Sequence, residues 1–456
     1  MGWKLKVAGY GKIESAEIEM APLTLFVGDN NSGKSYLMSL LWGILNLEEV
    51  FAGTGSALET EAEEWLLRWV KEQMETAREQ GLHSVQASEI GSELQTVLQA
   101  RVECHKDKLV KAIFNSADVD IKELQIELTG LDDISISFNV GASGDRTIFA
   151  ICLGNDAEEY VPYFPEKGRM PEDLNESDWN FVVNSIFRFL LNGGRFYKGR
   201  LRTLNEWIYL PAARTGFMLT KDVINKVGRR AAFNIGMETE TLQPFVRPIN
   251  QFLDVINDLT LDGESNESFA EIVEYLESGM ADGTVEMSSL PNKEVTYVPN
   301  GKTTGMSLRT VSAVVTELSP LILILKHKKN VGALFYEEPE MCLHPQLQQK
   351  MARVLCRLVN AGVQMNVTTH SDIILQHINN MIRLSGREDR EEICHQLRYD
   401  SRDLLWSEEV KVYQLRAEAG EKTKVEELSC GKNGFAVPTF NDALDRIMDE
   451  AYVIQE

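Results

Sequence analysis

Eight consecutive residues near the N-terminus have the composition of a phosphate-binding loop. Gly28 to Ser35 reads Gly-Asp-Asn-Asn-Ser-Gly-Lys-Ser, which fits the pattern GxxxxGK followed by Ser or Thr. Glycines let such a loop curl until backbone N–H groups and the next helix N-terminus face the phosphates. We expect Lys34 to reach the terminal phosphates of ATP and Ser35 to ligate Mg²⁺. The predicted nucleotide-binding residues are Gly28, Asn30, Asn31, Ser32, Gly33, Lys34, Ser35 and Tyr36.

A second group of chemically capable residues follows an apolar run in the last third of the chain. Val331 to Tyr336 is apolar and leads directly into the acidic sequence Glu337-Glu338-Pro339-Glu340. If the run is a parallel strand, these carboxylates lie at the carboxyl edge of the sheet, where ligands bind. We expect Glu337 to hold Mg²⁺, directly or through water, and Glu338 to orient and polarise the attacking water, because phosphoryl transfer depends on positioning and charge stabilisation.

A histidine occupies the corresponding place one strand later. Gln364 to Thr369 has strand character and ends in His370-Ser371-Asp372. At the same sheet edge, His370 can contact the γ-phosphate or the attacking water. With the phosphate loop and the paired acids, this histidine predicts an enzyme that binds and hydrolyses ATP, with Lys34, Glu338 and His370 as its catalytic residues.

The elements that must position these residues have the pattern of an α/β fold. Leu23 to Val27 is a strand-length apolar run before the loop, and Ser35 to Leu47 suits a helix packed on a sheet. From about Val295 onward, strand and helix patterns alternate, which is typical of parallel-sheet units. Ile134 to Phe138 instead alternates with a period of two and predicts antiparallel strands.

The order of these motifs resembles a known group of ATPases. The phosphate loop, a long interruption, Leu334-Phe-Tyr-Glu-Glu-Pro-Glu-Met-Cys-Leu-His-Pro345 and Thr368-Thr-His-Ser-Asp372 are similar to the ABC-type ATPase heads of the RecF, SMC and OLD (overcoming lysogenization defect) group. The likeness is greatest to the OLD-like ATPases of bacterial anti-phage defence operons. It implies a two-lobed ABC-type P-loop ATPase head, in which a mixed sheet is packed with helices and interrupted by helical insertions.

The resemblance assigns roles to further residues. It implies that Leu343-His344-Pro345 is the D-loop region and that His370 is the switch histidine. Thr310 to Leu318 corresponds to the signature segment, so Ser312 would bind the γ-phosphate of ATP held by another subunit in a head-to-tail dimer. Arg214, in the turn Leu210 to Gly216, resembles a residue that contacts phosphate or a neighbouring subunit; a structural arginine in a tight turn is the alternative.

The same comparison predicts the domain organisation and the partners. The expected parts are the N-terminal ATPase segment with the phosphate loop (1–58), a helical insertion (59–115), strands and helices of the first lobe (116–217), a second helical insertion (218–290) and the C-terminal ATPase lobe (291–456). OLD nucleases carry a Toprim domain with a metal-binding acid cluster after the ATPase. Residues 371–456 leave no room for it, and Asp400 and Asp403 have the wrong spacing.

The expected function is therefore that of an ATPase subunit in an anti-phage defence complex. It would form homo-oligomers, control a separate effector protein, either a nuclease or a toxin, and respond to a phage protein or a nucleic acid. Two alternatives stay open: a RecF- or SMC-like DNA-binding ATPase of repair or recombination, and a self-contained OLD-type nuclease.

Composition weighs on these alternatives. The 456 residues carry a formal net charge of −23, which opposes binding to nucleic acid outside a local basic surface such as Lys221, Lys226, Arg229 and Arg230. Solvated helix faces are the other reading of that cluster. No apolar run approaches the roughly 20 residues that span a bilayer, and the N-terminus does not resemble a secretory signal, so we expect a cytoplasmic protein. The six cysteines form no CxxC pair, which argues against a zinc ribbon.

Overall fold

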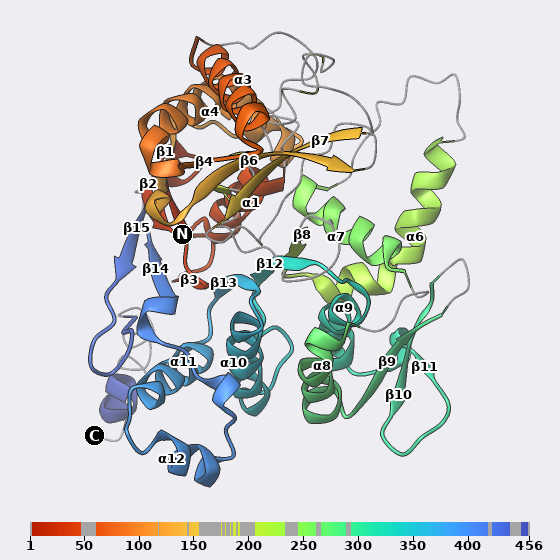
Figure 1. The fold of residues 1–456 in the computed structure, drawn as a ribbon. Helices are drawn as coiled ribbons and strands as arrows, with labels where there is room; N and C mark the ends of the chain where they lie inside the picture. The colour runs from red at the N-terminus through yellow and green to blue at the C-terminus, as the bar shows by residue number, and fades with distance from the viewer. Residues whose placement is uncertain are drawn as a thin grey trace. The chain divides into compact units, whose positions relative to one another are not determined.

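In the computed structural model the chain divides into two units, described separately below (Figure 1). The first comprises Met1–Met20, Gly43–Ala112 and Ser116–Asn205; the second comprises Ala21–Trp42, Ile113–Asn115 and Glu206–Glu456. The structure describes residues 2–46, 61–116, 118–143, 146–154, 206–232, 245–260, 266–288, 293–417, 422–437 and 448–454, with single positions between 175 and 191.

The first unit begins with an antiparallel sheet in the order β5-β1-β2. Its strands are β1 (Gly2–Tyr10), β2 (Ile13–Glu19) and β5 (Glu123–Thr129). Apolar and polar side chains alternate in these strands. Consequently Ala16 and Ile18 are buried on one face while Ser15 and Glu17 are exposed on the other.

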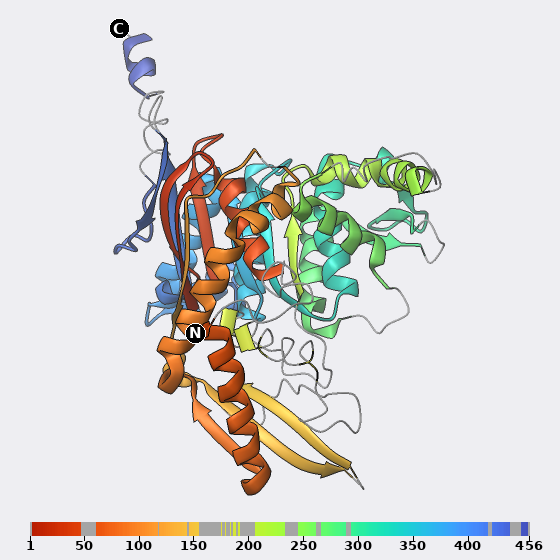
Figure 2. The same cartoon turned by 90° about the horizontal axis from the view of Figure 1, so that it is seen from above.

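Two helices and a second sheet complete the first unit. The helices are α3 (Glu61–Gln80) and α4 (Gly91–Phe114), and the sheet order is β4-β6-β7, with β4 (Leu82–Gln86), β6 (Ser135–Ser143) and β7 (Arg146–Gly154). The short 3-10 helices η1 (Ala87–Ile90) and η2 (Leu131–Asp133) lie beside them. Helix α3 lies along β6, as Figure 2 shows, with Trp69 edge-on to Phe138 at 5.7 Å.

The segment predicted as a helical insertion, 59–115, contains a short strand as well as helices. Residues 59–115 are not continuously helical, because β4 separates α3 from α4. Gly81 takes a left-handed φ of 83° and its N–H donates to Ala77 O, which ends α3. The five residues that follow pair antiparallel with β6. The helical pattern on either side concealed this short strand.

The second unit is built on a sheet whose order is β15-β14-β3-β13-β12-β8. Five strands are parallel: β3 (Leu23–Gly28), β8 (Glu206–Leu210), β12 (Val331–Glu337), β13 (Gln364–Thr369) and β14 (Val410–Arg416). Strand β15 (Thr423–Leu428) runs antiparallel to β14. Every residue of β3 is buried, because helices cover both faces of a parallel sheet. The predicted α/β class with a mixed sheet is confirmed.

Helices follow the parallel strands in sequence. They are α1 (Lys34–Asn46) after β3, α6 (Arg214–Ala232) and α7 (Arg247–Asp258) after β8, α10 (Pro345–Asn360) after β12, and α11 (Asp372–Ser385) after β13. Helix α9 (Ala313–His327) precedes β12 and is buried along most of its length. The outer strand β8 is capped by Gln251 of α7, which accepts from Tyr209 N–H at 3.1 Å and donates to Trp207 O at 2.7 Å. This side chain provides hydrogen-bond partners for backbone groups on the outer side of β8.

The remaining elements surround this frame (Figure 1). They are η4 (Glu267–Phe269), α8 (Ala270–Leu276), the π-helix η5 (Glu277–Ala281), the sheet of β9 (Gly283–Met287), β10 (Val295–Pro299) and β11 (Met306–Ser307), η6 (Leu308–Thr310), α12 (Arg390–Leu397), η7 (Ser401–Asp403) and η8 (Ser407–Glu409). Residues 448–454 are helical. In the part of the chain that the structure describes, every helix is too short or too polar to cross a bilayer.

Candidate active site

The residues singled out in the sequence gather at one edge of the sheet of the second unit. Strands β3, β8, β12 and β13 are parallel neighbours in that sheet, so their carboxyl ends share an edge. The turns that leave these ends carry the phosphate loop, Arg214, the acidic run and His370, respectively. This is the edge at which α/β sheets bind ligands.

The phosphate loop has the curled backbone that its glycines predict. Gly28 has a φ of 141°, Asn31 a φ of 63° and Gly33 a φ of 98°, so three residues within six positions leave the ordinary region of backbone conformation. The loop ends where α1 begins at Lys34. Asn30, Asn31, Ser35 and Tyr36 are exposed, whereas Ser32 is buried. A helix N-terminus preceded by such a loop favours a bound anion.

Lys34 points into this loop. Its Nζ donates to Gly28 O at 3.0 Å, to Asp29 O at 2.7 Å and to Ser32 Oγ at 3.4 Å. Burial lowers the pKa of Lys34 to about 8, although the nearby carboxylates, Glu338 first among them, act to raise it. At neutral pH the group is mostly charged, and all three of its donors face oxygen atoms.

Glu337 is buried at the end of β12, and its carboxylate is half satisfied. Its Oε2 accepts from Ala212 N–H at 3.1 Å, while Oε1 is buried without a hydrogen-bond partner. A buried carboxylate oxygen without a partner is costly and points to a missing ligand such as a cation or its water. The side chain, with the exposed hydroxyl-bearing Ser35, therefore fits a Mg²⁺ ion bound together with ATP.

Such an ion requires little more from the protein. Among the described residues, no cluster of three or more His, Cys, Asp or Glu side chains is arranged to hold a metal. Mg²⁺ at nucleotide sites keeps several waters and binds phosphate oxygens, so one or two protein ligands are sufficient. Ser35 and Glu337 are the two that we predict from the sequence.

Glu338 and His370 face each other across the sheet edge. Glu338 Oε1 lies 3.6 Å from His370 Nε2, and both side chains are partly exposed. The hydrogen bond from His370 lowers the pKa of Glu338, and the charges of His370, Lys34 and Arg214 lower it further against the opposing effect of burial. Glu338 is therefore an ionised carboxylate at neutral pH, which suits a group that orients and polarises water.

The backbone of Glu338 is held in an unusual conformation. Its φ is 42°, in the left-handed region that non-glycine residues seldom adopt. Its N–H donates to Thr368 O at 2.9 Å on the adjacent strand β13. The carboxylate is thus directed by a constrained backbone rather than by a free side chain.

Glu340 is a site residue that sequence reasoning did not assign a role. Its Oε1 accepts the backbone N–H of His370 at 2.6 Å, and its Oε2 is buried without a partner. Burial raises the pKa of Glu340. The signal was present as the third acid of the run Glu337 to Glu340, two residues after the predicted catalytic glutamate.

A further contact joins the expected D-loop to the turn after His370. Ser371 Oγ donates to Gln348 Oε1 at 2.6 Å, and Gln348 Nε2 donates to Leu343 O at 2.9 Å. His344 is exposed and caps the start of α10. Gln348 had not been singled out, because a lone glutamine in a helix carries no motif.

Arg214 lies beneath the acidic turn and is fully buried. It donates to the carbonyls of Pro211, Glu337 and Glu338, forms an ion pair with Glu317, and stacks over Tyr336 at 4.7 Å. Of the two interpretations made from the sequence, this environment supports the structural arginine rather than a side chain open to phosphate.

Ser312 lies at the start of α9, outside the cluster described above. It is the N-cap of α9, its side chain is exposed, and it accepts no capping hydrogen bond. The N-terminus of α9 therefore leaves backbone donors available to an external anion.

Comparisons with known proteins agree with this chemistry. A family model described as AAA ATPase domain matches residues 3–164 and 210–375. No match is found among curated protein sequences. The matched segments contain the phosphate loop, Glu337, Glu338 and His370.

Solved structures with similar chains include three heads of SMC proteins. The SMC head domain from Thermotoga maritima has 12% identity and a TM-score of 0.33, covering 93% of this chain and 98% of that chain. An Smc head domain with an extended coiled coil, bound to the C-terminal domain of ScpA derived from Pyrococcus furiosus, has 13% identity and a TM-score of 0.36, covering 99% of each chain. An Smc head bound to the C-winged helix domain of ScpA has 14% identity and a TM-score of 0.37, covering 94% of this chain and 98% of that chain.

Proposed function

Since the chain belongs to the AAA ATPase domain family and is an ATP-hydrolysing P-loop enzyme, we propose that it hydrolyses MgATP at the edge formed by the phosphate loop, Glu337, Glu338 and His370. The observation that carries this assignment is the position of Glu338. Its ionised carboxylate lies 3.6 Å from His370 Nε2, and its charge acts on buried Lys34. Residues some three hundred positions apart in the sequence are thus close enough for their charges to interact.

Binding uses the loop and its lysine. The phosphates take the place of the carbonyls of Gly28 and Asp29 as acceptors for Lys34 Nζ, while the start of α1 supplies backbone donors. Ser35 Oγ and Glu337 Oε1 would hold Mg²⁺, which when bound would neutralise charge on the phosphate oxygens. The exposed loop residues Asn30 and Asn31 flank the bound nucleotide.

Hydrolysis uses the pair across the edge. Glu338 accepts a hydrogen bond from the attacking water and fixes its direction, and His370 contacts the γ-phosphate or the same water. Glu340 acts one step further away, because it holds the His370 backbone N–H. Positioning and charge therefore supply the catalysis, as phosphoryl transfer requires.

Two substitutions separate binding from turnover. We expect Lys34→Ala to abolish ATP binding, whereas Glu338→Gln keeps ATP bound and lowers the rate of phosphate release by about 10²- to 10⁴-fold. Glu391→Gln on the exposed helix α12 is the matched control, and it should leave both quantities unchanged. Phosphate release and binding of a fluorescent ATP analogue measure the two effects; parental turnover by Glu338→Gln would contradict our assignment of the water-directing residue.

A head-to-tail dimer completes the site in this proposal. The support is Ser312, exposed at the start of α9 with backbone donors available to an anion. In a dimer this helix start approaches the γ-phosphate held by the other copy, as the resemblance to RecF, SMC and OLD heads implies. Closure by ATP and opening after hydrolysis would then be the mechanical output.

The biological setting that we propose is a cytoplasmic anti-phage defence complex. The support is the likeness of the motifs around Gly28, Glu338 and His370 to OLD-like defence ATPases. The chain would assemble with itself and hold a separate nuclease or toxin, releasing or activating it when a phage protein or nucleic acid is sensed. Purification together with the product of the adjacent gene tests this, with mass photometry as the readout; a stable monomer that never retains that product would contradict it.

A DNA-binding ATPase of RecF or SMC type is the alternative, and the same preparation tests it. It predicts ATP-dependent binding to duplex DNA with strong salt dependence. The basic cluster that would serve it is weakened, since Lys221 is buried and donates to Lys293 O at 3.0 Å. DNA cleavage by the purified chain with Mg²⁺ or Mn²⁺ would instead indicate a self-contained nuclease.

A further inference from the structure

One buried guanidinium supports the backbone of the proposed catalytic glutamate. Arg214 directs Nη1 to Pro211 O at 2.7 Å and to Glu337 O, and Nη2 to Glu338 O at 3.0 Å. Two of these acceptors are the carbonyls on either side of the Glu338 N–H and Cα. Arg214 therefore holds the backbone of Glu338 in its left-handed conformation, with a φ of 42°.

Helix α9, which contains most of the expected signature segment, holds Arg214 in place through Glu317. Glu317 of α9 is 1% exposed, and its Oε1 forms an ion pair with Arg214 Nη2. Its Oε2 accepts from Thr215 Oγ1 at 2.7 Å and from Thr215 N–H at 3.3 Å. A buried charge is tolerated only where it is paired in this way, so the position of Arg214 depends on Glu317.

These contacts form a continuous path between two parts of the proposed site. It runs from α9, whose first turn bears Ser312, through Glu317 and Arg214 to the carbonyl of Glu338. Each step is a direct contact between buried groups. A shift of α9 along its axis would move Glu317 and, through Arg214, the backbone that aims the Glu338 carboxylate.

We propose that Arg214 is a positioning residue for hydrolysis, which sets the direction of the Glu338 carboxylate and couples it to α9 through Glu317. This inference rests on the proposed ATPase site and adds to it the residue that makes that site sensitive to the signature helix. Arg214 itself touches neither the phosphates nor the water. Its removal should therefore affect turnover and leave nucleotide binding in place.

Lysine cannot substitute for this arginine. The guanidinium has five N–H donors in a planar fork, and two nitrogens of Arg214 contact four oxygen atoms. An ammonium has three donors on a single nitrogen. Arg214→Lys preserves the buried positive charge and removes the fork. It thus changes the aim of Glu338 without leaving Glu317 unpaired.

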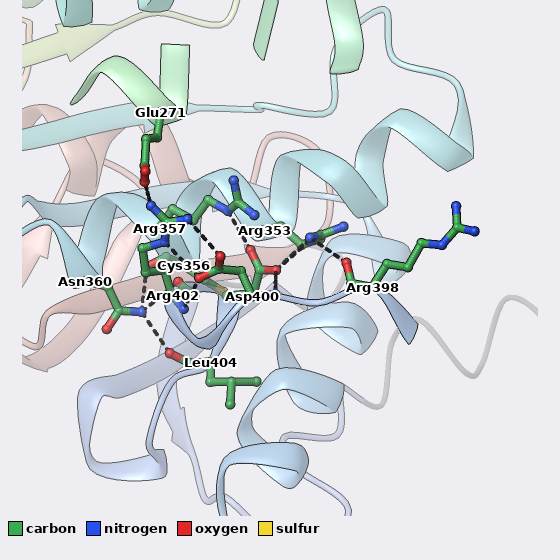
Figure 3. Close-up of polar contacts among 10 residues, drawn as sticks. Glu271, Arg353, Cys356, Arg357, Asn360, Arg398, Asp400, Arg402 and Leu404 are labelled. Atoms are coloured by element: carbon green, nitrogen blue, oxygen red, sulfur yellow. Dashed lines mark hydrogen bonds and ion pairs between the residues drawn. The ribbon is translucent and has the colours of Figure 1, made fainter. Parts of the chain in front are cut away.

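A second arginine in the same unit, largely covered by its neighbours, offers a matched control (Figure 3). Arg357 Nε donates to Asp403 Oδ1 at 2.6 Å, Asp403 is fully buried, and the guanidinium stacks over Tyr275 at 4.3 Å. Arg353 donates to the other oxygen of Asp403 at 2.7 Å. Arg357 lies twelve residues along α10 from Pro345, roughly 18 Å from the catalytic edge. Arg357→Lys thus removes a guanidinium that pairs with a buried carboxylate remote from Glu338.

The experiment compares the parent, Arg214→Lys, Glu317→Gln and Arg357→Lys as full-length proteins. For each, kcat and KM for ATP, the Kd of a fluorescent ATP analogue and the thermal midpoint are measured. We expect Arg214→Lys to lower kcat by at least about tenfold with Kd within about threefold of the parent, because small misplacements of catalytic groups are costly. Arg357→Lys should keep the parental kcat, although its thermal midpoint should fall as much as that of Arg214→Lys. Glu317→Gln, which keeps the side-chain volume, should lower kcat in the same direction and decides the question if Arg214→Lys does not fold.

Three results would overturn the inference. The first is a folded Arg214→Lys or Glu317→Gln with kcat within about twofold of the parent. The second is a rise in Kd with unchanged kcat, which would make Arg214 a phosphate ligand. The third is an equal loss of kcat in Arg357→Lys. Failure of the proposed ATPase site looks different, because the parent would then release no phosphate or Lys34→Ala would release it at the parental rate.

Discussion

The three acids at the end of β12 have different electrostatic environments although they lie within four residues. The hydrogen bond from His370 and nearby cations lower the pKa of Glu338, whereas burial raises the pKa of Glu340. Glu337 uses one oxygen on Ala212 N–H. Environments that push two carboxylates in opposite directions commonly separate their roles, and here Glu338 has the ionised state that catalysis needs.

At the same edge, Lys34 is a cation whose charge is sensitive to pH. Burial outweighs four surrounding carboxylates and brings its pKa to about 8. The free enzyme therefore loses this positive charge as the pH rises through 8, while a bound polyphosphate favours the protonated form. Proton uptake and ATP binding are coupled through this one group.

This coupling predicts the pH dependence of ATP affinity. We expect the Kd for ATP to be about tenfold weaker at pH 9 than at pH 7, because only a small fraction of Lys34 keeps its proton one unit above its pKa. Isothermal titration calorimetry measures the Kd across this range. Adenosine, which lacks phosphates, is the control ligand and should bind equally at both values. A Kd for ATP that stays constant to pH 9.5 would exclude a Lys34 pKa near 8.

At the scale of elements, the phosphate loop depends on how closely β3 approaches β14. Gly28 ends β3 with a φ of 141°, and a Cβ at this position would collide with the carbonyl oxygen of Leu415 on β14. The two strands are parallel neighbours, with Gly28 opposite Leu415. Glycine at position 28 therefore allows the close packing of β3 against β14 as well as the curled phosphate loop.

Two glycine substitutions test this packing. Gly28→Ala should lower the free energy of unfolding by about 1–3 kcal/mol from backbone strain alone, with a further loss from the contact with Leu415. Gly216→Ala is the control: this residue lies in α6, its backbone is not left-handed, and a Cβ added there would meet only open space. Alanine there should be neutral or stabilise by up to about 1 kcal/mol. Chemical denaturation compares the two, and equal stability of both variants would contradict the packing argument.

At the scale of the whole molecule, we propose that a second copy completes the site. The phosphate loop, Glu338 and His370 gather at one edge, while Ser312 is exposed at the start of α9. A head-to-tail dimer would bring Ser312 of each copy to the nucleotide of the other. In such a dimer, hydrolysis would depend on assembly, because each nucleotide site would contain residues of both copies.

Mixing two inactive variants tests the composite site. Ser312→Arg should disable only the nucleotide site that its own surface completes, and Glu338→Gln should block turnover in its own copy, so each homodimer is inactive. In a mixed dimer, the copy with intact Glu338 receives the intact Ser312 of its partner, which restores one of two sites. Random mixing before ATP is added should recover about a quarter of parental phosphate release. Ser312→Ala serves as the milder companion variant. The head-to-tail arrangement would be contradicted if the mixture stays inactive while Ser312→Arg alone binds ATP normally.

The local chemistry of this protein could be predicted from its sequence, because each motif is contiguous. Gly28 to Ser35 between a strand and a helix, the acids after Tyr336 and the histidine after Thr369 each depend on neighbouring residues and on the strand that precedes them. The strand that divides residues 59–115 was missed, since five alternating residues between two helices give too short a signal.

Only the tertiary structure decided which of these residues act together and what holds them. The pairing of Glu338 with His370, the acceptance of the His370 N–H by Glu340 and the clamp of Arg214 and Glu317 join residues that are 30 to 124 positions apart. Burial, which sets the pKa of Lys34 and leaves Arg214 without access to solvent, depends on packing from all sides. No periodicity along the chain encodes such contacts, because they arise where strands distant in sequence become neighbours in the sheet.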